Sequence, residues 1–257
     1  MLITGATGGL GQAMARELAG RGARLVLTGR RTSVLEPLAA ETGAALEAVD
    51  LADRDAVQAL IDRSGDVDVV IANAALPGSG TLDQFTDEQI DRTLDVNLRA
   101  PIVMARALAP QMVARGRGAL IFISSLSGKS ANPASSMYSA TKFGLRGFAL
   151  SLREDLHGTG VGVSLVNPGF IRDAGMFAES GTELPKGVGT KTPQDVARGV
   201  MRAIEKSPAE VDVAPVSLRA GAAFSLVAPG FSARVARRLG SAEIASRVAE
   251  GQSAKRG

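Results

Sequence analysis

The sequence predicts an α/β fold, in which a doubly wound parallel sheet of seven strands carries helices on both faces. Short β-rich runs alternate with longer helical runs along most of the chain, and the β-rich runs are apolar on both sides. Strands of this kind fit a parallel sheet that is covered on both faces. The length of 257 residues suits a single domain of this class.

The alternation begins with a short strand at the start of the chain. The first half is predicted as strand 2–4, helix 10–19, strand 24–28, helix 34–41, strand 45–49 and helix 56–63. The second half is predicted as strand 67–72, helix 87–115, strand 119–124, helix 137–156, strand 161–166, helix 193–205 and strand 210–213. Right-handed crossovers between such units place a ligand site at the carboxyl ends of the strands, where the strand order reverses.

Two segments do not follow the alternation and are predicted to be irregular. Residues 170–192 are rich in glycine and follow the sixth strand, where a substrate loop would lie. Residues 214–257 form a tail rich in small residues and arginine after the last strand. The tail holds seven Lys/Arg and two Asp/Glu, whereas the rest of the chain is close to neutral. A basic surface for nucleic acid is therefore not predicted.

The residue types that are scarce exclude several kinds of site. Cysteine is absent, which excludes disulfides and thiolate chemistry and fits a reducing cytoplasm. The single histidine, His157, is too little for a histidine metal site or a Ser-His-Asp triad, and its place at a helix end favours a structural role. We expect no metal, no signal peptide and no transmembrane segment.

A glycine-rich turn follows the first predicted strand. It reads Thr4-Gly5-Ala6-Thr7-Gly8-Gly9-Leu10-Gly11. Glycine permits a tight turn and lets the backbone approach a pyrophosphate, which the N–H groups of the next helix then face. A plain glycine-rich turn is the alternative, but the strand before and the helix after favour a dinucleotide site over residues 5 and 7–11.

The end of the second strand bears on which dinucleotide is bound. NAD sites place a carboxylate there for the ribose 2′-hydroxyl, but this chain has Arg30 and Arg31, and the next acid is Glu36. A guanidinium fits a 2′-phosphate. Two solvated arginines are the alternative, yet their position predicts NADP (NADPH) binding, by Arg30 more than by Arg31.

A serine, a tyrosine and a lysine follow the fifth strand. Tyr138 is the only tyrosine of the chain, Lys142 lies one helical turn later on the same face, and Ser125 ends the strand. A free phenol has a pKa near ~10, so a nearby ammonium is expected to lower the pKa of Tyr138 towards ~8. Lowered in this way, the phenol could exchange protons at neutral pH.

These motifs together resemble the short-chain dehydrogenase/reductase family, whose members are oxidoreductases with a Rossmann fold. The resemblance covers about residues 1–213, in the family's order and approximate spacing. It rests on the glycine turn, Asn73-Ala74-Ala75, Asn97, Ser125, Tyr138, Lys142 and Asn167-Pro168-Gly169. By this resemblance residues 1–213 form the dinucleotide-binding and catalytic domain.

The resemblance also implies a role for each site residue. Ser125 would orient the substrate oxygen, Tyr138 would exchange the proton and Lys142 would hold the nicotinamide ribose. Asn97 would order a water leading to Lys142. Cofactor contacts are expected from Asp50, Leu51, Asn73, Ala74, Ala75, Pro168, Gly169 and Ile171. The family's threonine after Pro-Gly is missing, and Asp173 could accept from the carboxamide instead.

The expected function is NADP-dependent hydride transfer between the nicotinamide and a mainly apolar carbonyl or secondary alcohol. The expected walls of the substrate pocket are Leu126, Met137, Phe170, Met176 and Phe177. A 3-oxoacyl thioester is an alternative substrate, and a non-catalytic NADP(H) sensor is an alternative function. By resemblance the helices 87–115 and 137–156 would build a homodimer or homotetramer.

The tail contains the material of an amphipathic surface. Its apolar and basic members are Phe224, Leu226, Val227, Phe231, Val235 and Leu239, with Arg234, Arg237 and Arg238. Binding at a membrane interface is one interpretation. A pocket lid or a subunit contact formed by residues 214–240 is the favoured one, since Pro229-Gly230 interrupts the helix.

Overall fold

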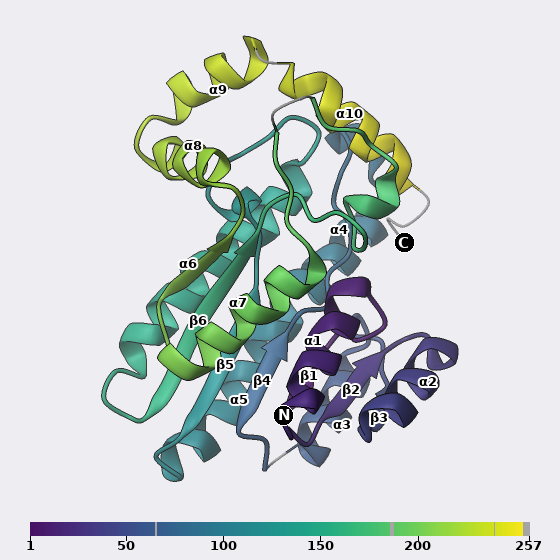
Figure 1. Cartoon of the computed structure of the whole chain (residues 1–257), viewed down its shortest axis with the longest axis vertical. Helices are drawn as coiled ribbons and strands as arrows, with labels where there is room; N and C mark the ends of the chain where they lie inside the picture. Colours follow the sequence, from purple (N-terminus) through teal and green to yellow (C-terminus); the bar gives the residue numbers. More distant parts are fainter. Residues whose placement is uncertain (65, 186–187, 239, 254–257) are drawn as a thin grey trace.

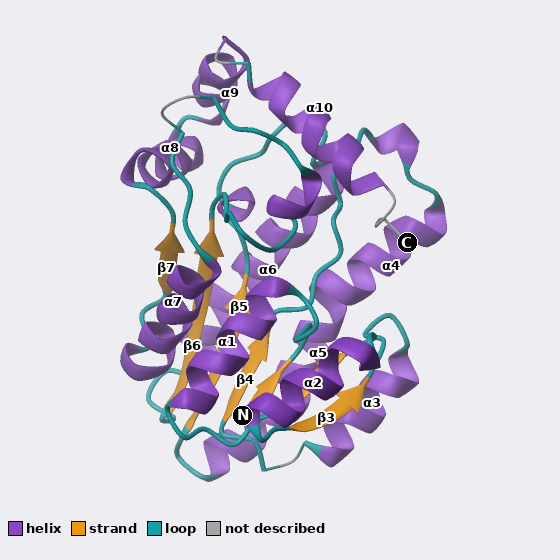
Figure 2. Ribbon diagram, turned by 45° about the vertical axis from the view of Figure 1, so that its right-hand side comes forward, coloured by secondary structure: helices purple, strands orange, loops and turns teal. Residues whose placement is uncertain are grey.

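A parallel sheet forms the centre of the protein (Figures 1 and 2). The structure is a computed structural model, and it describes residues 1–64, 66–185, 188–238 and 240–253. Within these residues seven strands lie in the order β3-β2-β1-β4-β5-β6-β7, and every neighbouring pair is parallel. The strands are β1 Leu2–Ile3, β2 Val26–Gly29, β3 Ala45–Ala48, β4 Val69–Ala72, β5 Gly118–Ile123, β6 Val161–Pro168 and β7 Glu210–Val213. The predicted doubly wound fold is confirmed.

Helices cover both faces of this sheet, and each face has its own apolar core. One core packs the sheet against α1 (Gly9–Gly20), α2 (Thr32–Thr42) and α7 (Pro193–Lys206). The other packs it against α3 (Arg54–Arg63), α5 (Ala100–Ala114) and α6 (Ser136–Asp155). The central strands are buried from both sides, which explains why they are apolar throughout.

The strand order reverses between β1 and β4. Thr4, directly after β1, joins the two strand ends, because its Oγ1 accepts hydrogen bonds from the backbone N–H groups of Asn73 and Ala74 at 3.0 and 3.1 Å. The side-chain amide of Asn73 donates back to the carbonyls of Thr4 and Gly5 at 2.9 and 3.1 Å. The turns after β1 and β4 are therefore held as one unit at the carboxyl edge of the sheet.

The helix predicted over 87–115 is interrupted. The chain forms α4 (Asp87–Leu94), a π-helical segment η2 (Asp95–Arg99) and then α5. A π segment adds a residue to one turn and shifts the direction of the side chains that follow. Helical periodicity covers all three parts, which is why the sequence alone predicts a single helix.

The prediction that the tail is irregular is wrong. Residues after β7 form α8 (Val216–Val227), α9 (Pro229–Arg238) and α10 (Ser241–Gln252). Pro229 ends one helix and starts the next, since proline is tolerated in the first turn. Alanine, leucine and arginine favour helix, which outweighs the small-residue composition on which the prediction rested.

Among the described residues, every helix falls short of the combined length and apolarity that crossing a bilayer requires.

Backbone hydrogen bonds join the two ends of the segment after β6. Lys191 donates its backbone N–H to Phe170 at 3.0 Å, and Arg172 donates to Lys191 at 2.9 Å. Its one short helix among the described residues is η4 (Ala178–Ser180). The two ends of the predicted loop 170–192 thus lie side by side at the carboxyl edge of the sheet.

Candidate active site

The glycine turn leaves no room for side chains at three of its positions. A Cβ on Gly5 would lie 2.9 Å from the backbone N of Ala74. A Cβ on Gly11 would lie 2.7 Å from Cα of Ala6, and one on Gly9 would collide with Ala174 in the 170–192 loop. Gly5 also has a φ of 64°, which favours glycine. The glycine turn therefore packs closely against the chain after β4 and against the 170–192 loop.

The two arginines after β2 behave differently. Arg31 donates from NH2 to the carbonyl of Thr7 at 2.8 Å and so braces the glycine turn. Arg30 is exposed, and its charge contributes to lowering the pKa of the nearby Asp50 carboxyl. Arg30 thus keeps its guanidinium in solvent near Asp50.

Asp50 is held by protein partners. Its carboxylate accepts from Arg92 NH2 at 2.6 Å and from the backbone of Ala52 at 3.1 Å. Desolvation raises the pKa of Asp50, but the hydrogen bonds from Arg92 and Ala52 outweigh it and hold the pKa below its usual value. The side chain of Leu51 is buried in the core. An adenine contact from this pair would come from the Asp50 carboxylate or from backbone groups.

Ser125 and Lys142 converge on Tyr138. Lys142 lies one turn along α6, and its Nζ lies 5.5 Å from the centre of the tyrosine ring. Ser125, at the start of η3 (Leu126–Gly128), is hydrogen-bonded to the phenol. Its Oγ also accepts from the backbone N–H of Ser127 at 3.1 Å, which fixes its direction. The predicted constellation is therefore assembled in space.

A backbone hydrogen bond positions the start of α6. Tyr138 donates its N–H to the carbonyl of Gly78 at 3.2 Å. A Cβ on Gly78 would lie 2.7 Å from that nitrogen, so only glycine fits there. The sequence interpretation missed Gly78, although its place shortly after Asn73-Ala74-Ala75 was a signal.

The predicted lowering of the tyrosine pKa is wrong in direction. Desolvation raises the pKa of Tyr138 to about 12, and the hydrogen bond with Ser125 offsets only part of this. The same desolvation lowers the pKa of Lys142 to about 8. Lys142 is 2% exposed and donates to the carbonyl of Ile123 at 2.9 Å. The expected lowering considered only the attraction between the Lys142 ammonium and the Tyr138 phenolate. It omitted the desolvation of both groups, which has the larger effect on their pKa values.

Asn97 lies in the π segment, and its side chain bonds to the loop after β4 and to α6. Its side chain donates to the carbonyl of Leu76 at 2.9 Å and accepts from the backbone of Leu76 at 2.7 Å. It also donates to Thr141 Oγ1 at 3.4 Å, next to Lys142. Asn97 is 1% exposed. It thus joins the loop after β4 to the helix that carries the tyrosine.

The residues after β6 reach the site unequally. Pro168 accepts from Ser125 Oγ at 3.5 Å, and Gly169 donates its N–H to Val213 at 3.1 Å. The side chain of Ile171 is buried in the core beneath α7, so only its backbone remains for a ligand. Asp173 is exposed, pairs with Arg172 at 3.5 Å and has a φ of 72°.

A buried network of charges lies next to the loop after β5 that carries Ser125 and η3, called the serine loop below. Lys129, 7% exposed, places Nζ 2.8 Å from Asp212 and 3.2 Å from Glu210. Arg146 of α6 donates to Glu210 at 2.8 and 3.2 Å, and Asn167 of β6 donates to both carboxylates. The network joins the serine loop, α6, β6 and β7. The sequence interpretation missed it, though two acids two apart on a strand share one face.

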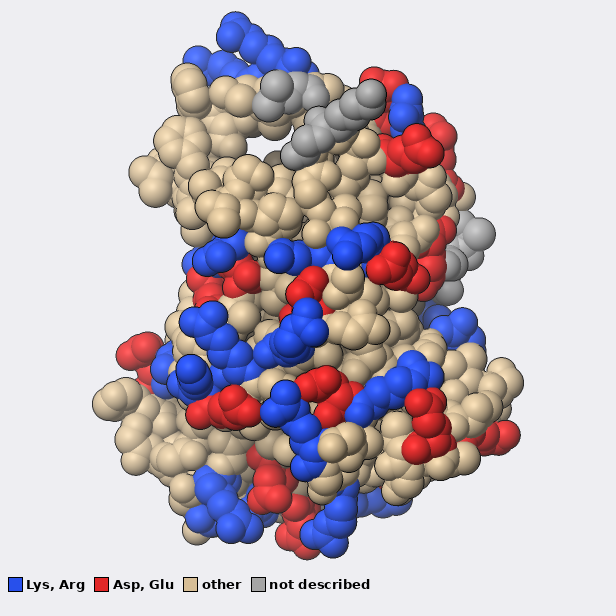
Figure 3. All heavy atoms as spheres, in the orientation of Figure 1, with Lys and Arg blue, Asp and Glu red and all other residues tan. Residues whose placement is uncertain are grey.

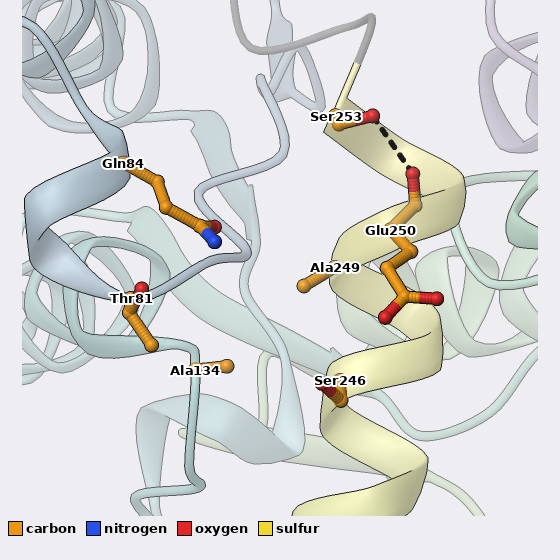
Figure 4. A pocket seen from close by; sticks show the side chains of 7 residues that line it. All are labelled: Thr81, Gln84, Ala134, Ser246, Ala249, Glu250 and Ser253. Carbon is orange, nitrogen blue, oxygen red and sulfur yellow. Dashed lines mark hydrogen bonds between the residues drawn. The ribbon is translucent and has the colours of Figure 1, made fainter.

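A pocket opens beside the site, between the loop after β4 and α10 (Figure 4). Its lining residues are Thr81, Gln84, Ala134, Ser246, Ala249, Glu250 and Ser253. None of these belongs to the expected apolar walls. Gly80 and Ser135 form a backbone bridge next to it, three residues before Tyr138. The pocket therefore adjoins the tyrosine helix at its start.

Comparison with known proteins places the chain among oxidoreductases. A sequence model of the family described as short chain dehydrogenase matches residues 1–184. The ketoacyl reductase HetN of Nostoc sp. is 35% identical over 226 residues, covering 83% of this chain and 77% of the relative. The serine 3-dehydrogenase of Agrobacterium fabrum is 34% identical over 213 residues, covering 78% and 85%.

A solved structure gives the same result in three dimensions. A short-chain dehydrogenase from Sphingobium yanoikuyae in complex with NADPH superposes with a TM-score of 0.75 at 28% identity, covering 92% of each chain.

Proposed function

Because this chain belongs to the short-chain dehydrogenase family, we propose that it is an NADP-dependent oxidoreductase acting on a mainly apolar carbonyl or secondary alcohol. The observation that carries the proposal is the convergence of Ser125 and Lys142 on Tyr138, the only tyrosine of the chain. Family membership supports the general activity and the use of a nicotinamide cofactor. The complex of one relative with NADPH supports the choice of NADP.

The fit of a dinucleotide is supported by the shape of the glycine turn. Gly5, Gly9 and Gly11 have no room for a Cβ because Ala74, Ala174 and Ala6 lie against them, and α1 starts within this turn with no side chain capping its first N–H groups. These residues, with Thr7, Gly8 and Leu10, would hold the pyrophosphate. Arg30 would bind the 2′-phosphate, since its guanidinium is exposed and lies near Asp50 rather than braced like that of Arg31. When bound, the cofactor supplies or accepts the hydride.

Tyr138 would transfer the proton to and from the substrate oxygen. With a pKa of about 12 the phenol is protonated at neutral pH, the state that donates to a carbonyl oxygen during reduction. Ser125 would hold that oxygen by a second hydrogen bond. Lys142, with Nζ beside the ring and a pKa of about 8, would bind ribose hydroxyls and pass a proton to the phenol through them.

The test of the proposal is a panel of aldehydes, ketones and secondary alcohols, each assayed with NADP(H) and NAD(H) at the nicotinamide absorbance. We expect turnover of at least one apolar ketone or alcohol, and faster turnover with NADP(H). Cofactor binding by titration calorimetry without any turnover across the panel would instead support the alternative of a non-catalytic NADP(H) sensor.

A 3-oxoacyl thioester is the second candidate substrate. It is favoured by the likeness to a ketoacyl reductase. Adding a short 3-oxoacyl thioester and the ketone that lacks its thioester to the panel separates the two. A kcat/KM for the thioester that exceeds the ketone value by about tenfold would assign the thioester.

Of the two roles expected for residues 214–257, we propose the lid, formed by α10 beside the substrate loop. Gln252 of α10 donates to the carbonyl of Met176 at 2.8 Å, and α10 packs on η4. Gln252→Ala should raise KM for substrate and leave the Kd for NADPH unchanged. If KM is unchanged in that variant and also in a chain ending at Ala214, the tail does not act as a lid.

We propose a homo-oligomer built on α5 and α6. Phe143 of α6 and Val113 of α5 are 38% and 36% exposed and would be covered in such an interface. Sedimentation velocity should give a dimer or tetramer, and Phe143→Glu should shift it to the monomer.

The absence of cysteine fits the cytoplasm as the place where this enzyme works.

A further inference from the structure

The outer side of α8 is apolar although it faces solvent. The helix packs inward through Ala222 and Ser225, which are 5% and 8% exposed. At 100° per residue, Val216 and Val227 lie on the opposite side, with Ala220 and Ala223 between them. Val216 and Val227 are 76% and 84% exposed. A surface helix of a soluble body shows the reverse pattern.

The next helix extends this face. Phe231 and Val235 of α9 are 56% and 40% exposed, and the ring of Phe231 meets that of Phe224 edge to face, with centroids 5.9 Å apart. Leu226 is 42% exposed on α8. Leu239, which the sequence also suggested for this surface, lies outside the described residues. Exposed apolar side chains of both helices therefore lie at one end of the molecule, where Figure 1 places α8 and α9.

The charges on α8 and α9 have one sign. The arginines of α8 and α9 are Arg219, Arg234, Arg237 and Arg238, and residues 216–238 contain no Asp or Glu. All four arginines are exposed. Figure 3 shows the basic groups at the tip of the molecule above α8 and α9, with no acidic group over these two helices in that view. The remainder of the drawn surface mixes both signs.

We propose that α8 and α9 form a docking surface for an anionic phospholipid bilayer. Exposed valine and phenylalanine beside arginine, without acids, is the composition that lies in the headgroup region of such a membrane. The two helices form a protruding end, which a planar surface can meet. The interaction is peripheral, because the apolar side belongs to short helices lying on the protein.

Charge complementarity argues against a second copy of the chain as the occupant. A two-fold interface centred on this surface would bring two sets of the same four arginines together with no acid to pair them. An acidic bilayer supplies the opposite charge and an apolar layer at once. The proposal does not depend on the reaction that the site performs.

Docking in this way would set the catalytic site beside the lipid. The inner side of α8 contacts the serine loop, where Ser225 and Ser130 place their hydroxyl oxygens 3.1 Å apart. Val227 and Ser225 lie on opposite sides of α8, so about one helix diameter, ~10 Å, separates the proposed bilayer-facing side from this contact. An apolar substrate dissolved in the membrane would therefore enter close to η3.

Vesicle flotation with the full chain tests the proposal. The vesicles contain phosphatidylcholine alone, or equal parts of phosphatidylcholine and phosphatidylglycerol. We expect the protein to float with the anionic vesicles, about tenfold or more above neutral ones, and to be released as salt is raised. No flotation with the anionic vesicles overturns the proposal.

Two double variants separate the apolar and the charged contributions. Val216→Ser/Val227→Ser removes the two most exposed valines at unchanged charge, and Arg234→Gln/Arg238→Gln removes two charges. Each should lower the vesicle partition coefficient about tenfold. The control Arg24→Gln/Arg106→Gln has the same net charge as the arginine variant and changes exposed arginines elsewhere, so it should bind like the parent. Circular dichroism and Tm confirm that each variant folds.

Three further results would overturn the proposal. Parent-like flotation of both patch variants would place the membrane contact elsewhere. An oligomer that the valine variant dissociates, with no vesicle binding, would assign the surface to a second copy. Binding to polyglutamate that the valine variant leaves unchanged, again without vesicle binding, would assign it to an acidic protein.

Discussion

The two halves of the sheet differ in how deeply some of their charged side chains are buried. Around β1–β3 the charges lie in solvent, as in the Arg16–Glu41 pair, where both side chains are about half exposed at 48% and 51%. Around β4–β7 the Arg117–Asp68 pair is exposed as well, but Lys129 and Lys142 near Ser125 are enclosed, at 7% and 2% exposed. Buried charges have strongly shifted pKa values and well-fixed positions, whereas exposed ones mainly select among ligands. The proposed chemistry lies in the enclosed half and the proposed cofactor selection in the open half.

The sharpest test of the enclosed half is Tyr138→Phe. Removing the hydroxyl deletes the proposed proton donor and leaves the packing of the ring in place, so kcat should fall about a hundredfold to ten-thousandfold. The Kd for NADPH, measured by fluorescence, should stay unchanged. A variant within about threefold of the parent in kcat would show that the phenol has no part in proton transfer.

The next largest effect should come from Lys129→Met. It leaves Glu210 and Asp212 enclosed with a single remaining cation, Arg146, and should destabilise the protein by about 3 kcal/mol in urea denaturation. Arg16→Met, which breaks an exposed pair, is the matched control and should leave the urea midpoint nearly unchanged. Equal midpoint shifts in the two variants would show that the enclosed Lys129 contributes no more to stability than the exposed Arg16.

In the open half, Arg30→Ala should act on cofactor choice alone. We expect the parent to bind NADPH at least about tenfold more tightly than NADH, and the variant to lose most of that preference. Arg31→Ala is the comparison, because it removes the brace on Thr7 and should weaken both cofactors alike. Equal affinities of the parent for the two cofactors would leave Arg30 without a role.

The smallest expected effect is a pH dependence from Glu210. Desolvation raises the pKa of its carboxyl, but the hydrogen bond from Arg146 and the charge of Lys129 outweigh this and lower it below the usual value. A lowered folded-state pKa gives stability that is present above about pH 4.3 and is lost as the pH falls through the folded value. The advantage of the parent over Glu210→Gln in Tm should therefore shrink in acid. A constant advantage would contradict the assignment.

Most of the fold could be predicted because its signals are local. The central strands β4 and β5 are apolar by themselves, and the glycine turn after β1 can be recognised from adjacent residues. The helices of the tail were missed because their places depend on distant partners, such as Ser130 for α8 and Met176 for α10. The π segment at Asn97 was missed because one added residue in a turn leaves the periodicity of 87–115 almost intact.

The closeness of Ser125, Tyr138 and Lys142 could be predicted from the sequence, but the pKa values of the tyrosine and the lysine could not. Ser125, Tyr138 and Lys142 come together as their spacing on strand and helix indicated. The pKa of Tyr138 could not be predicted, because desolvation depends on every element packed around the ring. The network of Lys129, Arg146 and Glu210 draws on residues far apart in the sequence, so no local pattern connects them.

The contact between Gly9 and Ala174 constrains how the 170–192 loop can be exchanged. A methyl group at position 174 already fills the space that a methyl group at position 9 would need. A donor loop with a larger residue at 174 would push against the glycine turn, and a donor with glycine there would tolerate alanine at 9. Transplanting a loop from a relative to change selectivity should therefore carry both positions together.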